Sequence, residues 1–226
     1  MSLSNQQMIE SLRSGNVDAA MLLLQHGASA NARDSEGNPA IVIAASRALP
    51  DACRVLIAAG ANVNARSSDG TTALMRAAAN GSTATVRVLV ESCADSNAVN
   101  CQHMSALMFA SFQGYYASAK VLLDNGAIVN EVDDLGYTAL AYAANQGRVQ
   151  VVQLLLNHNA DVSKCDNQGN TPLMFAVQSG NIDIVQALLR CGAAVSARNK
   201  DNKSALDIAK MHGHAQIETV LSSATH

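Results

Sequence analysis

Residues 133–165 read DDLGYTALAYAANQGRVQVVQLLLNHNADVSKC, and this stretch decides the fold of the chain. Asp133–Gly136 has the composition of a tight turn, and Thr138 is placed to cap a helix that starts near Ala139. That helix should stop at Gly147, because glycine readily adopts the left-handed conformation found just past helix ends. A second apolar segment, VQVVQLLLN, predicts another helix. The unit is therefore expected to be turn, helix, turn, helix and loop.

The unit recurs every 33 residues along the whole chain, without an insertion or a deletion. Three columns of glycine show this period: Gly37, Gly70, Gly136 and Gly169; Gly15, Gly81, Gly114, Gly147, Gly180 and Gly213; and Gly27, Gly60, Gly126 and Gly192. Five positions in these columns carry another residue: Ala48, Cys93, His103, Asn159 and Asn202. Columns of alanine and of paired aliphatic residues keep the same register. A fixed period of this length predicts stacked repeats that bury a shared apolar core.

At this level of detail the sequence resembles the ankyrin repeat family. Residues 166–198, DNQGNTPLMFAVQSGNIDIVQALLRCGAAVSAR, are similar to its pattern, which includes a T-P-L-H-x-A helix start. The resemblance covers residues 4–221 and implies an all-α repeat fold of the solenoid class, with helix-turn-helix units joined by turn or β-hairpin loops. The chain departs from the pattern at its histidine, which is expected to remove one side-chain hydrogen bond per repeat. The replacements are Met75, Met108, Ala141 and Met174.

We predict one ankyrin repeat domain over residues 1–226, built from seven units. The expected bounds are 1–33, 34–66, 67–99, 100–132, 133–165, 166–198 and 199–226. The first and last units should act as caps, because end repeats need a more polar outer face. Polar residues near both ends fit that role, and they favour a monomer.

Composition excludes several classes of protein. The chain of 226 residues is 49% hydrophobic and 15% charged, too apolar for a disordered chain. Its net charge of −3 supplies no general attraction for nucleic acid or an anionic membrane. The five cysteines show no CxxC spacing, which favours reduced thiols over disulfides or zinc ligands. Neither a secretion signal nor a membrane-spanning segment is evident, so a cytoplasmic location is expected, with the nucleus as the alternative.

Motifs for catalysis are missing from the sequence. Every glycine either follows the repeat register or lies in a turn, so no phosphate-binding loop is indicated. His212 and His214 are the nearest approach to a metal pair, but a solvated turn explains them more simply. We therefore expect no enzyme activity, no catalytic residues, no cofactor and no metal site.

The most distinctive surface is expected in repeats four and five. Six of the seven aromatic residues lie between positions 109 and 142. In ankyrin proteins a partner commonly contacts variable turn and inner-helix positions on the concave face. The residues at such positions, or beside them, are Met104, Phe112, Gln113, Asp134, Leu135, Tyr137, Asn145 and Gln146. Apolar and aromatic side chains of this kind form binding hot spots, so we predict that a protein or peptide binds here. Phe109, Tyr142 and Phe175 share one inner-helix column and are assigned to the core.

Charge adds a second feature to this surface. Four acids without a base lie near the aromatic residues: Asp124, Glu131, Asp133 and Asp134. Four arginines lie nearer the N-terminus: Arg33, Arg47, Arg66 and Arg76. A partner that is basic toward the centre and acidic toward the start would be complementary. An ordinary solvated surface is the alternative.

Three further hypotheses stay open. Phe112, Tyr137 and Asp134 could form a cage for methylated lysine through cation–π contacts. The array could instead be a structural scaffold without a single partner. Finally, Asn64 and Asn130 resemble asparagines that an oxygenase hydroxylates in many eukaryotic ankyrin proteins. The simpler role for these asparagines is a hydrogen bond to the backbone of their own turn.

Overall fold

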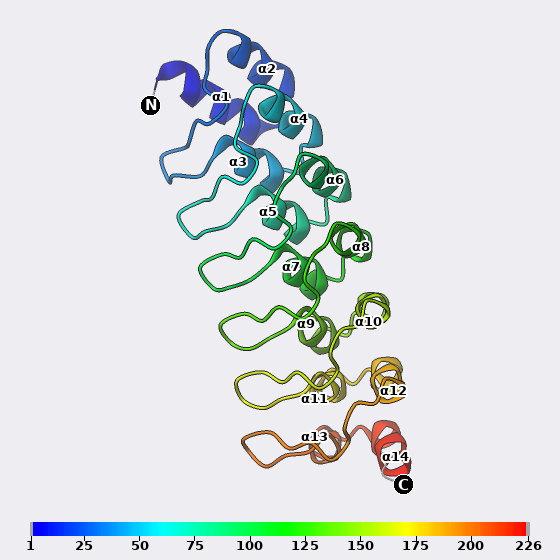
Figure 1. Cartoon of the computed structure of the whole chain (residues 1–226). Helices are drawn as coiled ribbons and strands as arrows, with labels where there is room; N and C mark the ends of the chain where they lie inside the picture. Colours follow the sequence, from blue (N-terminus) through cyan, green and yellow to red (C-terminus); the bar gives the residue numbers. More distant parts are fainter. Residues whose placement is uncertain (1, 225–226) are drawn as a thin grey trace. The chain divides into compact units, whose positions relative to one another are not determined.

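A computed structural model describes residues 2–224, and all of its regular elements are α-helices (Figure 1). The fourteen described helices form seven pairs that follow the predicted register. In chain order they are α1 Leu3–Ser14, α2 Val17–Gln25, α3 Ala40–Ser46, α4 Pro50–Ala58, α5 Ala73–Ala79, α6 Thr83–Glu91, α7 Ala106–Gln113, α8 Tyr116–Asp124, α9 Ala139–Asn145, α10 Val149–Asn157, α11 Pro172–Gln178, α12 Ile182–Arg190, α13 Ala205–His212 and α14 Ala215–Ser223. No helix in the described part of the chain is long and apolar enough to cross a membrane.

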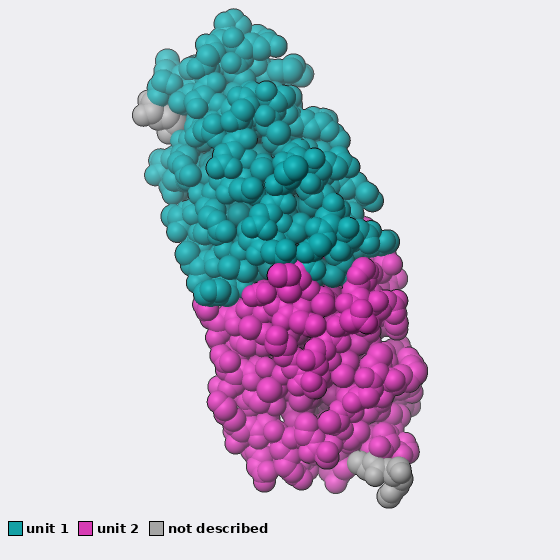
Figure 2. Space-filling model, viewed as in Figure 1, with its two compact units in different colours: residues 1–110, 120–127 teal, residues 111–119, 128–226 magenta. Residues whose placement is uncertain are grey.

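The chain divides into two compact units, coloured separately in Figure 2. Unit 1 comprises residues 1–110 and 120–127, and unit 2 comprises residues 111–119 and 128–226. In unit 1 the first helices α1, α3 and α5 pack on one another, and so do the second helices α2, α4 and α6. In unit 2 the same two rows are α9, α11, α13 and α10, α12, α14. One domain over residues 1–226 remains a prediction.

The core of each repeat follows the small and aliphatic columns. An alanine column on the first helices is fully buried at every position: Ala44, Ala77, Ala110, Ala143, Ala176 and Ala209. Leucines on the second helices are also buried: Leu56, Leu89, Leu122, Leu155 and Leu188. Alanine permits close approach of neighbouring helices, while each buried leucine contributes about 1.5–3 kcal/mol before chain entropy is subtracted.

Helix starts are specified locally, as the capping hydroxyls predict. Thr138 Oγ1 accepts a hydrogen bond from the Ala141 N–H at 3.1 Å. Equivalent bonds are made by Thr72, Ser105, Thr171 and Ser204. The expected loss of a hydrogen bond at the histidine position is only partly correct. In two repeats a methionine sulfur, Met75 Sδ or Met108 Sδ, accepts from the N–H of the capping residue at 3.5 Å.

The backbone conformation explains the glycine columns. All fourteen glycines have positive φ, as the predicted turns require. The non-glycine residues with positive φ are Ala48, Cys93, His103, Asn159 and Asn202. These are the five residues that replace glycine in the repeat register. The left-handed conformation is therefore a property of the position in the repeat, and the chain keeps it even where a side chain adds strain.

The long loops before the first helices are narrow hairpins. Isolated antiparallel bridges close four of them: Arg33 with Pro39, Arg66 with Thr72, Val99 with Ser105, and Arg198 with Ser204. At one loop position the side-chain oxygen accepts hydrogen bonds from the N–H groups two and four residues later. The residues that do so are Asp34, Asn100, Asp133, Asp166 and Asn199. The expected turn and hairpin loops are thus present.

Candidate functional site

Seven of the eight predicted contact residues lie in unit 2. Phe112 and Gln113 are exposed at the end of α7, while Asn145 and Gln146 are half-buried at the end of α9. The remaining three, Asp134, Leu135 and Tyr137, belong to the loop before α9. Met104 belongs to unit 1, where it is half-buried and its N–H donates to Asn100 Oδ1 at 2.9 Å. The candidate site is therefore described from the residues of unit 2.

Four aromatic rings form a row across this site. The ring of Tyr142 on α9 lies 5.8 Å from that of Phe112, edge to face, and 5.0 Å from that of Tyr137. Tyr137 in turn lies 5.0 Å from Phe175 on α11. These separations are typical of attractive aromatic pairs, each worth about 0.5–1.5 kcal/mol beyond the area that it buries. The row therefore joins three successive repeats through ring contacts.

Burial along the row differs from the expectation for several rings. Phe175 is buried, as expected for a core residue, but Phe109 and Tyr142 are only half-buried. Tyr137, expected on the recognition surface, is half-buried because it packs between two other rings. Phe112 keeps 37% of its surface exposed. Tyr137 thus belongs to the packing of the row as well as to its outer edge.

Asp133 positions the loop that carries the site. Its carboxylate is 7% exposed and accepts from the Leu135 N–H at 2.9 Å and the Tyr137 N–H at 2.8 Å. Its second oxygen accepts from the Tyr142 hydroxyl at 2.5 Å. Asp133 is therefore a loop-forming residue, and the expectation that it contributes to an acidic surface is wrong. Its place in the column of Asp34, Asn100, Asp166 and Asn199 was the sequence signal that indicates this role.

The two tyrosines of the row stay protonated over the ordinary pH range. Burial, the hydrogen bond to Asp133 and the charge of that carboxylate raise the pKa of Tyr142. Burial, together with the charges of Asp166 and Asp133, raises the pKa of Tyr137. Among the described residues the Tyr137 hydroxyl has no hydrogen-bond partner, so it can donate to a ligand.

The tip of the loop presents Leu135 on a fixed backbone. Asn167 in the next loop donates from its backbone N–H to the Leu135 carbonyl at 2.9 Å, and from Nδ2 to the Asp134 carbonyl at 2.8 Å. Gly136 has a φ of 81°, and a Cβ there would lie 2.8 Å from the Asn167 nitrogen. The Leu135 side chain remains 62% exposed. A large apolar side chain is thus held outward by a loop that its neighbour restrains.

The rest of the expected acidic group and the arginines also behave differently from a simple charged surface. Asp124, in unit 1, pairs with Lys120 at 2.8 Å. Arg33 and Arg66 each donate to two backbone carbonyls, one in their own loop and one in the next. These two arginines tie successive loops together through Nη1, so each has a structural role in addition to its charge. The other two predicted arginines, Arg47 and Arg76, make no such bonds to carbonyls of the described loops.

Asn64 and Asn130 hold neighbouring repeats together. Asn64 Oδ1 accepts from the Asp95 N–H at 2.9 Å, and Asn130 Oδ1 accepts from the Asp161 N–H at 2.8 Å. Asn130 Nδ2 also donates to the Asn159 carbonyl at 3.3 Å. Both side chains bond to the backbone, as predicted, but the backbone groups belong to the following repeat and not to the turn beside the asparagine.

The arrangement of the aromatic row does not favour a methyl-lysine cage. A cage needs ring faces turned toward one shared cavity. Here the ring of Tyr137 lies against the rings of Tyr142 and Phe175, with interplanar angles of 33° and 35°. No group of three or more potential metal ligands occurs among residues 2–224. What the site offers chemically is an apolar and aromatic surface with amide and hydroxyl groups at its edge.

Comparisons with known proteins agree with the repeat pattern. A family model described as ankyrin repeats (3 copies) matches residues 43–133 and 126–199. The human ASB11 ankyrin repeat domain, a solved structure, is 27% identical, with a TM-score of 0.87 over 96% of each chain. A search of curated proteins found no match. The predicted all-α repeat fold of the solenoid class is thereby confirmed. Ankyrin repeats are general protein–protein interaction modules, and the fold is generally non-enzymatic.

Proposed function

The chain belongs to the ankyrin repeat family, and from this premise we propose that it is a non-enzymatic module that binds a protein or peptide. The proposed contact surface is the face formed by loops and first helices, which is concave in ankyrin proteins. Its centre is the aromatic row with Leu135, and Gln113, Asn145 and Gln146 supply polar contacts at the edge. No small-molecule cofactor takes part in this proposal.

The exposed Leu135 on a restrained loop is the observation that supports this proposal most directly. A leucine that keeps 62% of its surface exposed gains about 1–2 kcal/mol when a partner covers it. Because the loop is already hydrogen-bonded at both Asp133 and Asn167, little backbone entropy is lost on binding. Phe112 adds a partly exposed ring nearby in the same unit. Such rigid apolar anchors are typical of interface hot spots.

The test is a double variant that removes the two anchors and leaves both packed tyrosines and the Tyr137 ring contacts in place. Phe112→Ala with Leu135→Ser is compared with Tyr116→Ala with Leu22→Ser, because Tyr116 and Leu22 are 42% and 55% exposed and lie elsewhere. Proteins captured from the source cell and identified by mass spectrometry are quantified for the wild type and for each variant. We expect specific partners to be lost with the first variant, retained with the second, and no large change in melting temperature. Equal recovery with both variants would exclude the proposed surface.

A location in the cytoplasm or nucleus is part of the same proposal. Four of the five free cysteines have exposed thiols: Cys93, Cys101, Cys165 and Cys191. Exposed unpaired thiols suit a reducing compartment, because an oxidising one would modify or cross-link them.

Hydroxylation of Asn64 and Asn130 is a second, independent proposal. The side-chain amides bond to the next repeat, so a modifying enzyme needs a local opening of the loop to reach them. Coexpression with an asparaginyl oxygenase should add the mass of one oxygen atom per modified residue. An unchanged intact mass would exclude this proposal.

A further inference from the structure

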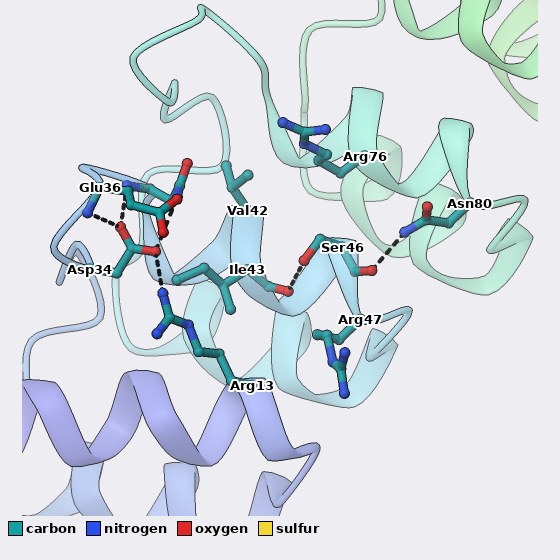
Figure 3. Close-up of a pocket in the computed structure, with 10 residues that line it drawn as sticks. Arg13, Asp34, Glu36, Val42, Ile43, Ser46, Arg47, Arg76 and Asn80 are labelled. Carbon is teal, nitrogen blue, oxygen red and sulfur yellow. Dashed lines mark hydrogen bonds and ion pairs between the residues drawn. The ribbon is translucent and has the colours of Figure 1, made fainter.

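Unit 1 contains a groove that none of the predicted contact residues lines. It has a volume of about 300 Å³ and is formed by α1, α3, α5 and the loop that follows α2 (Figure 3). Its arginines come from three successive repeats: Arg13, Arg47 and Arg76. Figure 3 shows these side chains arranged around α3, with Val42, Ile43 and Ser46 of that helix between them. The groove therefore combines positive charge with a short apolar floor.

The three arginines are specific to this groove and are not part of the repeat scaffold. In each of their three register columns no other repeat carries a lysine or an arginine. At the position of Arg76, for example, other repeats carry Ile43, Phe109, Tyr142, Phe175 and Ile208. The scaffold arginines Arg33, Arg66 and Arg198 belong to another column and bond to loop carbonyls. The charge in the groove therefore has no structural role that recurs along the chain.

One arginine of the groove is already neutralised. Arg13 Nη2 pairs with the buried Asp34 carboxylate at 2.9 Å. Asp34 also accepts from the N–H groups of Glu36 and Asn38. Burial alone would raise the pKa of Asp34, but its hydrogen bonds from Asn38, Glu36 and Arg13 outweigh burial and lower it. Asp34 therefore stays ionised, and this end of the groove needs no further counter-charge.

The other two guanidinium groups are available to a ligand. Among the described residues the Arg47 guanidinium has no hydrogen-bond or ion-pair partner. Arg76 approaches Asp69 at 3.4 Å, and both side chains are about half-exposed, so this ion pair is weak. A neighbouring hollow shares Ser46, Arg47 and Asn80 with the groove and continues the surface past the end of α3. Asn80 Nδ2 donates to the Ser46 carbonyl at 2.7 Å, which joins α5 to α3 beneath it.

We propose that this groove is a subsite for an acidic side chain, aspartate or glutamate, in an extended segment of the protein partner. The exposed guanidinium groups of Arg47 and Arg76 supply the positive charge that attracts the carboxylate, and the floor of Val42 and Ile43 contacts the adjoining carbon atoms. A guanidinium matches a carboxylate in shape and can bind it through two parallel hydrogen bonds. The proposal rests on the proposed protein-binding function and adds the chemistry of one partner segment.

A carboxylate fits this groove better than a nucleic acid does. Glu36 and Asp69 lie close to the arginines, so the groove has mixed charge and is not the continuous basic surface that binds a phosphate backbone. The chain as a whole has a net charge of −3, which opposes nucleic acid further.

The test measures binding of short fluorescent peptides to the full chain by anisotropy. The probes are a hexaglutamate peptide, a hexaglutamine peptide and an oligothymidylate of the same charge as hexaglutamate. We expect saturable binding of hexaglutamate only. Replacing Arg47 and Arg76 by glutamine should weaken this binding by about tenfold, which is the loss expected for two partly exposed ion pairs.

The control has the same change in net charge on another face of unit 1. Arg54→Gln with Arg87→Gln removes two exposed arginines from α4 and α6, and hexaglutamate affinity should stay within about twofold of the wild type. Equal weakening in both double variants, equal binding of oligothymidylate, or no saturable binding by the wild type would overturn the proposal. If hexaglutamate fails while the Phe112 and Leu135 variant still loses its partners, only the acidic subsite is overturned. Melting temperatures of all variants identify any loss that comes from unfolding.

Discussion

Arg76 in unit 1 and Tyr142 in unit 2 occupy the same position of the repeat, yet they serve different purposes. Each side chain reaches an acid of the loop before its own helix: Arg76 lies 3.4 Å from Asp69, and Tyr142 lies 2.5 Å from Asp133. The tyrosine locks a buried carboxylate and joins a row of rings, whereas the arginine stays half-exposed beside a groove. The repeat therefore determines where a side chain points, and the residue type determines whether that side chain packs between rings or stays half-exposed.

The largest difference between the units is expected at one glycine column. Gly136 and Gly37 have φ angles of 81° and 84°, but only at Gly136 would a Cβ meet backbone, 2.8 Å from the Asn167 nitrogen. We expect Gly136→Ala to lower the free energy of unfolding by about 3 kcal/mol and Gly37→Ala by about 1 kcal/mol. Chemical denaturation of both variants measures this. Equal losses would mean that the close approach of the two loops has no energetic cost.

A second comparison uses the turn-forming column, where Asp133 and Ser67 are equivalent. Asp133→Ala removes three partly buried hydrogen bonds to a buried carboxylate and should cost about 2–3 kcal/mol. Ser67→Ala should change stability by less than about 0.5 kcal/mol, because the buried Ser67 hydroxyl has no hydrogen-bond partner. Urea titrations of the two variants give both values. A large loss in Ser67→Ala would show that its hydroxyl is satisfied by water.

Because of the Tyr142 hydroxyl, we expect the stability of the chain to depend on pH in the alkaline range. The equivalent residue of unit 1, Arg76, has no such hydroxyl. The pKa of Tyr142 is raised in the folded chain, so its contribution to stability is complete below pH 10, the ordinary tyrosine value, and is lost above it. The wild type should therefore lose stability more steeply between pH 10 and 12 than Tyr142→Phe does. Denaturation at several alkaline pH values tests this, with Tyr116→Phe as the control on an exposed tyrosine. Parallel curves for the wild type and Tyr142→Phe would contradict it.

The smallest effect is expected where the arginine itself is replaced. Arg76→Ile introduces the residue found at Ile43 and removes only an exposed ion pair. The free energy of unfolding should change by no more than about 0.5 kcal/mol, with a correspondingly small shift in melting temperature. The change should be still smaller at high salt. Calorimetry at low and high salt measures it. A loss comparable to that in Asp133→Ala would assign Arg76 to the scaffold and remove it from the groove's binding role.

Local features of the structure could be predicted from the sequence because they depend on nearby residues. Thr138 caps α9 through an N–H three residues away, and Gly147, in the same repeat, lies just past the end of this helix. The substitutes His103 and Asn202 show that even an unusual backbone conformation can be inferred when four other repeats carry glycine at the same position. Leu135 was also identified correctly as exposed, since a turn tip has no neighbour on its outer side.

The hydrogen bond of Tyr142 to Asp133, the burial of Tyr137 and the ion pair of Arg13 could not be inferred in the same way. Each depends on a contact with another element: a tyrosine hydroxyl nine residues away, one ring from the same repeat and one from the next, and a carboxylate in the next loop. Periodicity shows that such positions face a neighbour but not which atoms of the neighbour come within reach.

The sequence by itself determined the helix pairs, their caps, the turn positions and the stacked-repeat architecture, because a 33-residue register repeats local chemistry seven times. Only the tertiary structure decided which loop residues are buried, which aromatic rings pack together and which arginines remain available for a ligand. Those outcomes depend on side chains from different repeats meeting at distances of 3–6 Å. Sequence spacing sets the position of each side chain, and packing between repeats determines its partner.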